Sequence, residues 1–114
     1  MTILEELNSV LEATKIPVET GYFTGKVPTT YLVLTPLTDV YALHADNRPH
    51  ADIEEVRISL FTTLNYNPIK ARILRVLLDA DFTVTDRRYL GWDAEAGYHG
   101  YSIDVQKHYE LEEN

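Results

Sequence analysis

The sequence predicts one α+β domain over residues 1–114, a two-layer structure in which a mostly antiparallel sheet carries two helices packed on one face. Its 114 residues suffice for a single domain with one hydrophobic core. A hydrophobic content of 45% with 25% charged residues is typical of a globular protein. Segments with a helical apolar period alternate with segments of strand character, which gives the expected order α-β-β-β-β-α-β-β.

The N-terminal segment has the signals of a capped helix that ends before a proline. Thr2 and Glu5 have the spacing of a capping box, and apolar residues from Ile3 to Leu11 recur at helical intervals. Pro17 is expected to end the helix, because the residue before a proline avoids the α conformation. A short strand over Val18–Phe23 follows.

The middle of the chain is predicted to form three further strands. Thr30–Thr35 is rich in β-branched and aromatic residues, and Val40–Ala45 is expected to return after a turn at Pro36 and Asp39. Residues 53–63 alternate in polarity, as in an antiparallel strand with one covered face. The buried side is expected to contain Val56, Ile58, Leu60 and Thr62.

The second helix is predicted from Asn67, as N-cap, and Pro68, at the first helical position, to about Ala80. Its apolar arc is about twice the 100° that packing on a sheet alone requires. The arc therefore predicts a second packing partner, either the first helix or another subunit. The strands Phe82–Leu90 and Tyr98–Tyr109 complete the domain.

Composition excludes several kinds of site. The chain has no cysteine, so it forms neither disulfides nor thiolate metal sites, and its net charge of −8 disfavours nucleic acid and anionic membranes. No apolar run approaches the roughly 18 residues of a membrane span. Glu5 and Glu6 stand where a signal peptide carries basic residues, so we expect no export by that route. Residues 67–90 are nevertheless basic, with five cations and three acids.

Neither catalytic nor metal-binding residues are predicted. His44, Asp46, His50 and Asp52 are the best candidate metal ligands, but the turn that separates the two pairs does not fix a coordination geometry. Ser59 and Ser102 lie within predicted strands and outside any nucleophile motif. We therefore expect a protein without a cofactor that is not an enzyme. Eight tyrosines instead suggest contact surfaces, or edges of the core.

Several short patterns resemble the small tail-completion proteins of siphophages and prophages, which comprise tail terminator and head–tail joining proteins. They are Pro28-x-x-Tyr31, Ala45-Asp46-Asn47 before a long strand, the second helix, and Tyr101-x-x-x-Val105-x-Lys107. The resemblance covers residues 25–109. One departure is Asp81, where glycine is expected in the turn after the second helix. Asp also adopts the left-handed conformation of such turns.

The resemblance implies a structural protein of the virion tail, assembled in the cytoplasm of the bacterial host. Such a protein forms a homo-oligomeric ring, a hexamer, that caps the tail tube and helps to join tail to head. Its partners are further copies of itself, the tail tube protein and the head connector protein, and the loops 21–28 and 46–52 are expected to order on contact. The predicted interface residues are Lys70, Arg72, Arg75, Arg87, Arg88, Tyr31, Tyr89 and Asp46.

The alternative is a non-viral binding module or dimeric regulatory domain that uses the same sheet and helix, with a small metal-dependent enzyme ranking third. Bound metal after loading distinguishes the enzyme from the two binding proteins. Capping of tail tubes distinguishes the virion protein from the regulatory module.

Overall fold

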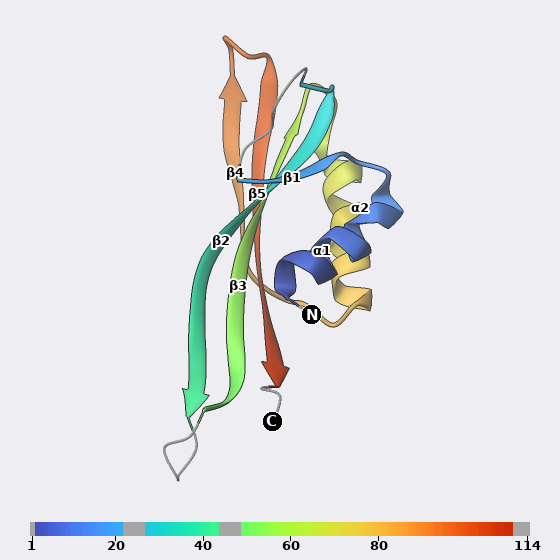
Figure 1. Ribbon diagram of the computed structural model, residues 1–114. Helices are drawn as coiled ribbons and strands as arrows, with labels where there is room; N and C mark the ends of the chain where they lie inside the picture. Colours follow the sequence, from blue (N-terminus) through green and yellow to red (C-terminus); the bar gives the residue numbers. More distant parts are fainter. Residues whose placement is uncertain (1, 22–26, 44–48, 111–114) are drawn as a thin grey trace.

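The computed structural model describes residues 2–21, 27–43 and 49–110, with side chains except those of 38–43, 49–52 and 110. Two helices, a short 3-10 helix and five strands follow one another along these residues (Figure 1). In chain order they are α1 (Ile3–Leu11), η1 (Glu12–Thr14), β1 (Val18–Thr20), β2 (Thr30–Leu43), β3 (Pro49–Thr62), α2 (Tyr66–Asp79), β4 (Thr83–Asp93) and β5 (Tyr98–Glu110).

The five strands form one sheet in the order β1-β2-β3-β5-β4. Only the β1–β2 pair is parallel, and the other three pairs are antiparallel. Both helices lie on one face of the strongly twisted sheet and pack against each other (Figure 1). The predicted fold class is confirmed, and the first helix is the second partner of α2.

The hydrophobic core lies between the helices and one face of the sheet. The side of β3 predicted to be buried is fully buried, because β3 is a central strand covered by both helices. Each large aliphatic side chain removed from water contributes about 1.5–3 kcal/mol to folding. The core joins Leu32 and Leu34 of β2, Val56, Ile58 and Leu60 of β3, and Ile103 and Val105 of β5 to Ile3, Leu7, Leu11, Ile73 and Leu77 of the helices.

One predicted turn is wrong. The segments Thr30–Thr35 and Val40–Ala45 were expected to be two strands, but β2 runs without interruption from Thr30 to Leu43. The strand passes Pro36 through a register shift between Pro36 and Thr38. Among the residues that the structure describes, no strand pairs with the outer side of β2 beyond Leu34, so the missing N–H of Pro36 is tolerated at a bulge on a sheet edge.

Several boundaries also differ from the sequence prediction. β1 is shorter than the predicted strand over 18–23, and residues 49–52, expected in a loop, begin β3. The N-cap of α2 is Asn65 rather than Asn67, and its side chain accepts a hydrogen bond from the Asn67 amide. Pro68 therefore lies within the first helical turn, where its missing N–H leaves no bond unmade.

Two other helix ends agree with the sequence prediction. Thr2 caps α1 by accepting a hydrogen bond from the Glu5 amide at 3.2 Å. Asp81, after α2, has a φ of 65°, the left-handed conformation for which glycine was expected. The turn is thus formed at the small energetic cost of a side chain in that region.

A polar cluster joins both helices to β5. Lys107 forms an ion pair with Glu6 of α1 and donates a hydrogen bond at 2.8 Å to the Ala80 carbonyl, which follows α2. Tyr109 donates a hydrogen bond to the other Glu6 carboxylate oxygen at 2.8 Å. Burial, reinforced by the bond to Glu6, raises the pKa of Tyr109. This cluster fixes the helix layer on the sheet at one end.

Candidate protein-interaction surface

β4 is a terminal strand of the sheet, and within the described residues it pairs only with β5. Its outer row of backbone N–H and C=O groups therefore has no strand partner in that part of the chain. Such an edge is a template for association unless it is twisted away or charged. β4 has both protections. Register shifts between Val84 and Asp86 and between Tyr89 and Gly91 twist the strand, and two adjacent arginines give it charge.

Large apolar side chains are exposed along the second half of this edge. Tyr89 is 44% exposed, and Leu90 and Trp92 are each 52% exposed. Single exposed apolar residues need no explanation, but three within four positions of one open strand are a marked concentration. They occupy both faces of the strand: Tyr89 stacks on Tyr66 on the helix side, and Leu90 lies beside Phe61 on the other. Tyr and Trp are also enriched at protein interfaces, where a rigid ring supplies contact area at low entropic cost. We refer to Tyr89, Leu90 and Trp92 as the β4 patch.

Ring stacking holds Tyr89 in place. Its ring stacks on Tyr66, the first residue of α2, at a centroid distance of 5.0 Å, and Tyr66 stacks on Tyr101 at 5.5 Å. The Tyr89 hydroxyl forms a hydrogen bond with Nδ1 of His99 at 3.0 Å, and the Trp92 ring lies 4.6 Å from the His99 ring. The exposed faces of these rings are thus preorganised by packing, which lowers the entropic cost of binding a partner.

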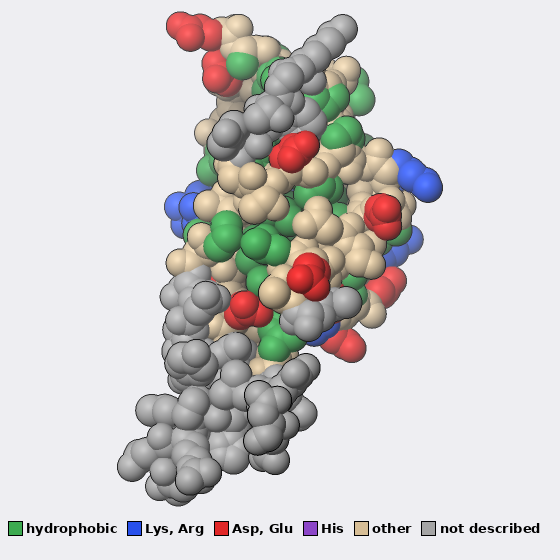
Figure 2. All heavy atoms as spheres, viewed as in Figure 1, with side chains coloured by type: hydrophobic (Ala, Val, Ile, Leu, Met, Phe, Trp, Pro, Cys, Tyr) green, Lys and Arg blue, Asp and Glu red, His purple; other side chains and the backbone are tan. Residues whose placement is uncertain are grey.

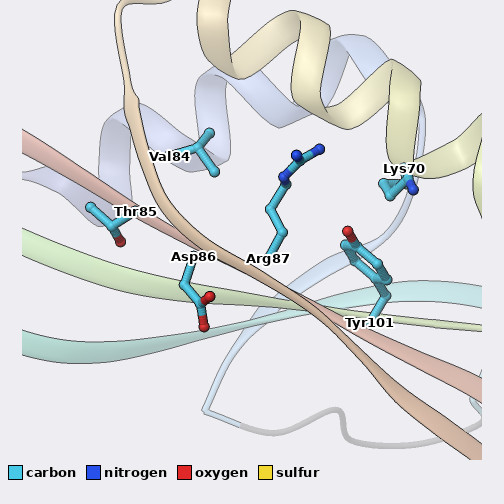
Figure 3. A pocket seen from close by; sticks show the side chains of 6 residues that line it. All are labelled: Lys70, Val84, Thr85, Asp86, Arg87 and Tyr101. Carbon is cyan, nitrogen blue, oxygen red and sulfur yellow. The ribbon is translucent and has the colours of Figure 1, made fainter.

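A shallow groove of about 450 Å³ lies between α2 and β4. Its lining comprises Lys70, Val84, Thr85, Asp86, Arg87 and Tyr101. Figure 3 shows Arg87 extending from β4 toward the helices, while Lys70 lies on α2 beside the Tyr101 ring. The Lys70 ammonium lies 5.1 Å from the Tyr101 ring centre and 5.6 Å from that of Tyr66, so the aromatic stack positions this cation.

The structure brings only some of the predicted interface residues together. Lys70, Arg87 and Tyr89 belong to one surface, because Arg87 pairs in register with the inward-facing Ile103 and so shares the helix side of the sheet. Arg88 pairs with Ser102 on the opposite face and forms an ion pair with Asp86 at 3.2 Å.

The remaining predicted interface residues lie elsewhere. Arg72 and Arg75 are exposed on α2 and form no ion pair with any residue that the structure describes. Tyr31 lies on the sheet face without helices, stacked on Phe61 at 5.1 Å. Burial and the neighbouring Tyr98 raise the pKa of Tyr31. Asp46 lies outside the described residues.

The sheet face without helices has an aromatic end and a charged end. A cavity of about 240 Å³ at the aromatic end is lined by Tyr31, Phe61, Leu90, Trp92 and Tyr98, among others. At the charged end, Arg57 binds Asp104 through two hydrogen bonds of 2.8 and 3.1 Å, which raises the pKa of Arg57. Trp92 and Leu90 were not predicted as site residues, since their exposure depends on the position of β4 in the sheet.

The opposite side of the molecule carries acidic residues. Figure 2 shows acidic side chains distributed over the face that α1 occupies, with basic side chains near its margins. From α1 to β1 the sequence contains four glutamates and one lysine. Of these, Glu5, Glu12 and Glu19 are exposed and form no ion pair with another described residue. We refer to these three glutamates as the acidic edge: Glu19 lies on β1, the terminal strand opposite β4, whereas Glu5 and Glu12 lie in the helix layer, on α1 and η1.

Within residues 2–21, 27–43 and 49–110, no group of three or more His, Asp or Glu side chains is arranged to hold a metal ion. Of the four candidate ligands, His44 and Asp46 lie outside the described residues, as do the side chains of His50 and Asp52. None of the described helices is long and apolar enough to cross a membrane.

Neither a scan of protein-family models nor a comparison with curated proteins finds a match to this chain.

Proposed function

We propose that this protein is a structural assembly protein of a phage or prophage virion, which caps the tail tube and helps to join tail to head. It acts through ring-forming contacts between copies of itself and binds the tail tube protein and the head connector protein. The observation that carries the proposal is the presence of two surfaces of opposite charge on one subunit. One is the β4 patch with Lys70 and Arg87, and the other is the acidic edge.

Two different complementary surfaces are what a ring requires. A head-to-tail contact joins one surface of each subunit to the other surface of its neighbour, and it closes into a ring when the rotation between subunits permits. A two-fold dimer that pairs two copies of β4 about their midpoint instead places Arg87 and Arg88 of one subunit beside those of the other. Like charges opposed across antiparallel strands are destabilising, so the arginines favour the head-to-tail arrangement.

The resemblance supplies the biological setting. Of the patterns that are similar to tail-completion proteins, Tyr31 lies on β2, the second helix is α2, and Tyr101 to Lys107 lie on β5, whereas Ala45-Asp46-Asn47 lies outside the described residues. The net charge of −8 suits a ring through which DNA passes, since an acidic lumen repels the phosphate backbone. We place the protein in the virion tail, after assembly in the bacterial cytoplasm.

The direct test uses purified protein and purified tail tubes. Negative-stain microscopy of the mixture is expected to show an added ring at one end of the tube, and light scattering is expected to show a closed oligomer once assembly begins. Tubes whose ends remain bare over a wide range of protein concentration contradict the proposal. The variant Tyr89→Ser with Trp92→Ser is expected to leave tubes uncapped, since it removes the two rings of the β4 patch.

The regulatory-module alternative predicts a different result in the same experiment. A two-fold dimer that uses β4 stops at two copies and leaves tube ends bare. Light scattering that gives twice the monomer mass, with no capping, favours that alternative.

A further inference from the structure

Lys70 and Arg87 are cations without a charged partner in the described structure. Neither Arg87 nor Lys70 forms an ion pair with any residue in that part of the chain, and the Lys70 ammonium lies over the rings of Tyr66 and Tyr101. The one acid in the groove, Asp86, is paired with Arg88. The groove therefore presents two cationic groups above a largely buried aromatic ring, Tyr101.

We infer that this groove binds carboxylate side chains of the acidic edge of a second copy of this chain. The inference rests on the proposed ring-forming function and identifies the contact that closes the ring. Lysine and arginine donate charge-assisted hydrogen bonds to carboxylates, and these are stronger than bonds between neutral groups. The shallow form of the groove suits a side chain presented by another protein surface.

The acidic edge fits the groove in charge and in placement. Glu12 and Glu19 are exposed and form no ion pair with another described residue. Glu19 lies on β1 and Arg87 on β4, the two terminal strands of the sheet, and Glu12 lies on η1 beside α2. One subunit does not bring Glu19 and Arg87 together across its own sheet. Two subunits arranged head to tail bring these groups together, and the pair then retains a free groove on one subunit and a free acidic edge on the other for further neighbours.

Tyr89 of the β4 patch adds contact area beside the charged groups. Tyr89 lies next to the groove through its stacking on Tyr66, which also contacts Lys70. An apolar anchor beside charge-complementary groups is the usual composition of a specific interface, in which the charges select the partner and the rings supply most of the affinity.

A zero-length carbodiimide cross-linker tests the contact, because it joins a lysine amine to a carboxylate only where the two groups touch. A mixture of unlabelled and ¹⁵N-labelled full-length protein is cross-linked at rising concentration, and the peptides are identified by mass spectrometry. The expected product is a mixed-isotope peptide that joins Lys70 to Glu12 or Glu19. Arg87→Lys is expected to add a second product that joins residue 87 to the same segment.

A matched pair of variants gives an independent readout. Lys70→Met with Arg87→Met removes both charges while keeping side-chain length, and it is expected to weaken self-association in sedimentation velocity by about tenfold. Arg88 lies on the other face of β4, so Arg88→Met is expected to change the strength of self-association by less than about twofold. Raising the salt concentration should weaken the wild-type association and affect the double variant less.

The outcomes separate this inference from the proposed function. If rings cap tail tubes but Lys70 never cross-links to the segment from Glu5 to Glu19, the groove assignment is wrong and the proposed function stands. If the protein neither self-associates nor caps tubes, both are wrong. Equal weakening by the double variant and by Arg88→Met also overturns the groove assignment, since it would reflect net charge alone.

Discussion

Replacing Lys107 by methionine tests how the helix layer is attached to the sheet. The Lys107 side chain is only 22% exposed, and it forms an ion pair with Glu6, whose side chain is 19% exposed. It also donates to the Ala80 carbonyl at 2.8 Å and lies 4.5 Å from the Phe82 ring centre. Methionine keeps most of the apolar contact but removes the charge and the donors.

These contacts set the expected loss in the free energy of unfolding. Breaking a buried pair by removing one partner costs about 3–5 kcal/mol, and the partial exposure of this pair reduces the figure to about 2–3 kcal/mol. Most of that cost arises because the Glu6 carboxylate and the Ala80 carbonyl lose a partner while they remain largely covered. In a domain of this size, a loss of 2–3 kcal/mol lowers the thermal midpoint by roughly 6–12 °C.

The assay is urea unfolding at pH 7 followed by circular dichroism. It compares the free energy of unfolding of the wild type, Lys107→Met, Arg75→Met and the double variant Glu6→Met with Lys107→Met. Arg75→Met is the matched control on an exposed helix face, and it is expected to change stability by less than about 0.5 kcal/mol. Glu6→Met combined with Lys107→Met is expected to be more stable than Lys107→Met alone, because no unpaired charge remains. A Lys107→Met protein within about 0.5 kcal/mol of wild type would refute the reasoning.

Three further predictions concern other parts of the molecule. Because the pKa of Tyr109 is raised above its ordinary value of 10.0, the folded state binds more protons than the unfolded state at alkaline pH, so the free energy of unfolding is expected to fall above about pH 10. Tyr109→Phe is expected to reduce that fall in alkaline unfolding curves, and an unchanged slope contradicts the assignment. Asp81→Gly is expected to stabilise the protein by about 0.5–1 kcal/mol in urea unfolding, since φ is 65° at that residue, and destabilisation would show that the side chain has a further role. Charge reversal of Arg72 and Arg75 together is expected to leave the thermal midpoint within about 2 °C of wild type, because both are exposed and unpaired in the described structure; a larger fall would place them in an intramolecular network. If the stripe they form contacts a neighbouring subunit, the same reversal also abolishes assembly.

The sequence predicted which face of the sheet is covered, because the alternation of apolar and polar residues along a strand depends only on neighbouring residues. The alternation in β3 identified Val56, Ile58 and Leu60, and all three are fully buried. The same reasoning failed at Pro36, which is a frequent turn residue but lies here at a bulge where the sheet edge tolerates it. Whether a proline ends a strand depends on tertiary position, and local sequence does not encode that position.

The candidate surface was less predictable, since a β-bulge decides which arginine reaches the groove. With regular alternation, Val84 and Asp86 would share a face and Arg87 would lie on the other. The register shift between Val84 and Asp86 inverts this, so Asp86 pairs with Asp104 on the uncovered face and Arg87 joins the helix side. The basic segment was recognised in the sequence, but its division between two faces depends on this single inserted residue.

The central claim is that copies of this chain join head to tail through unlike edges, and a charge-swap experiment tests it most directly. One variant carries Lys70→Glu with Arg87→Glu, and the other carries Glu12→Lys with Glu19→Lys. Each variant alone is expected neither to self-associate in sedimentation velocity nor to cap tail tubes. An equimolar mixture of the two is expected to do both, because every interface then joins complementary charges. If the Glu12→Lys, Glu19→Lys variant assembles alone, or if the mixture remains monomeric and leaves tubes bare, the head-to-tail account is contradicted.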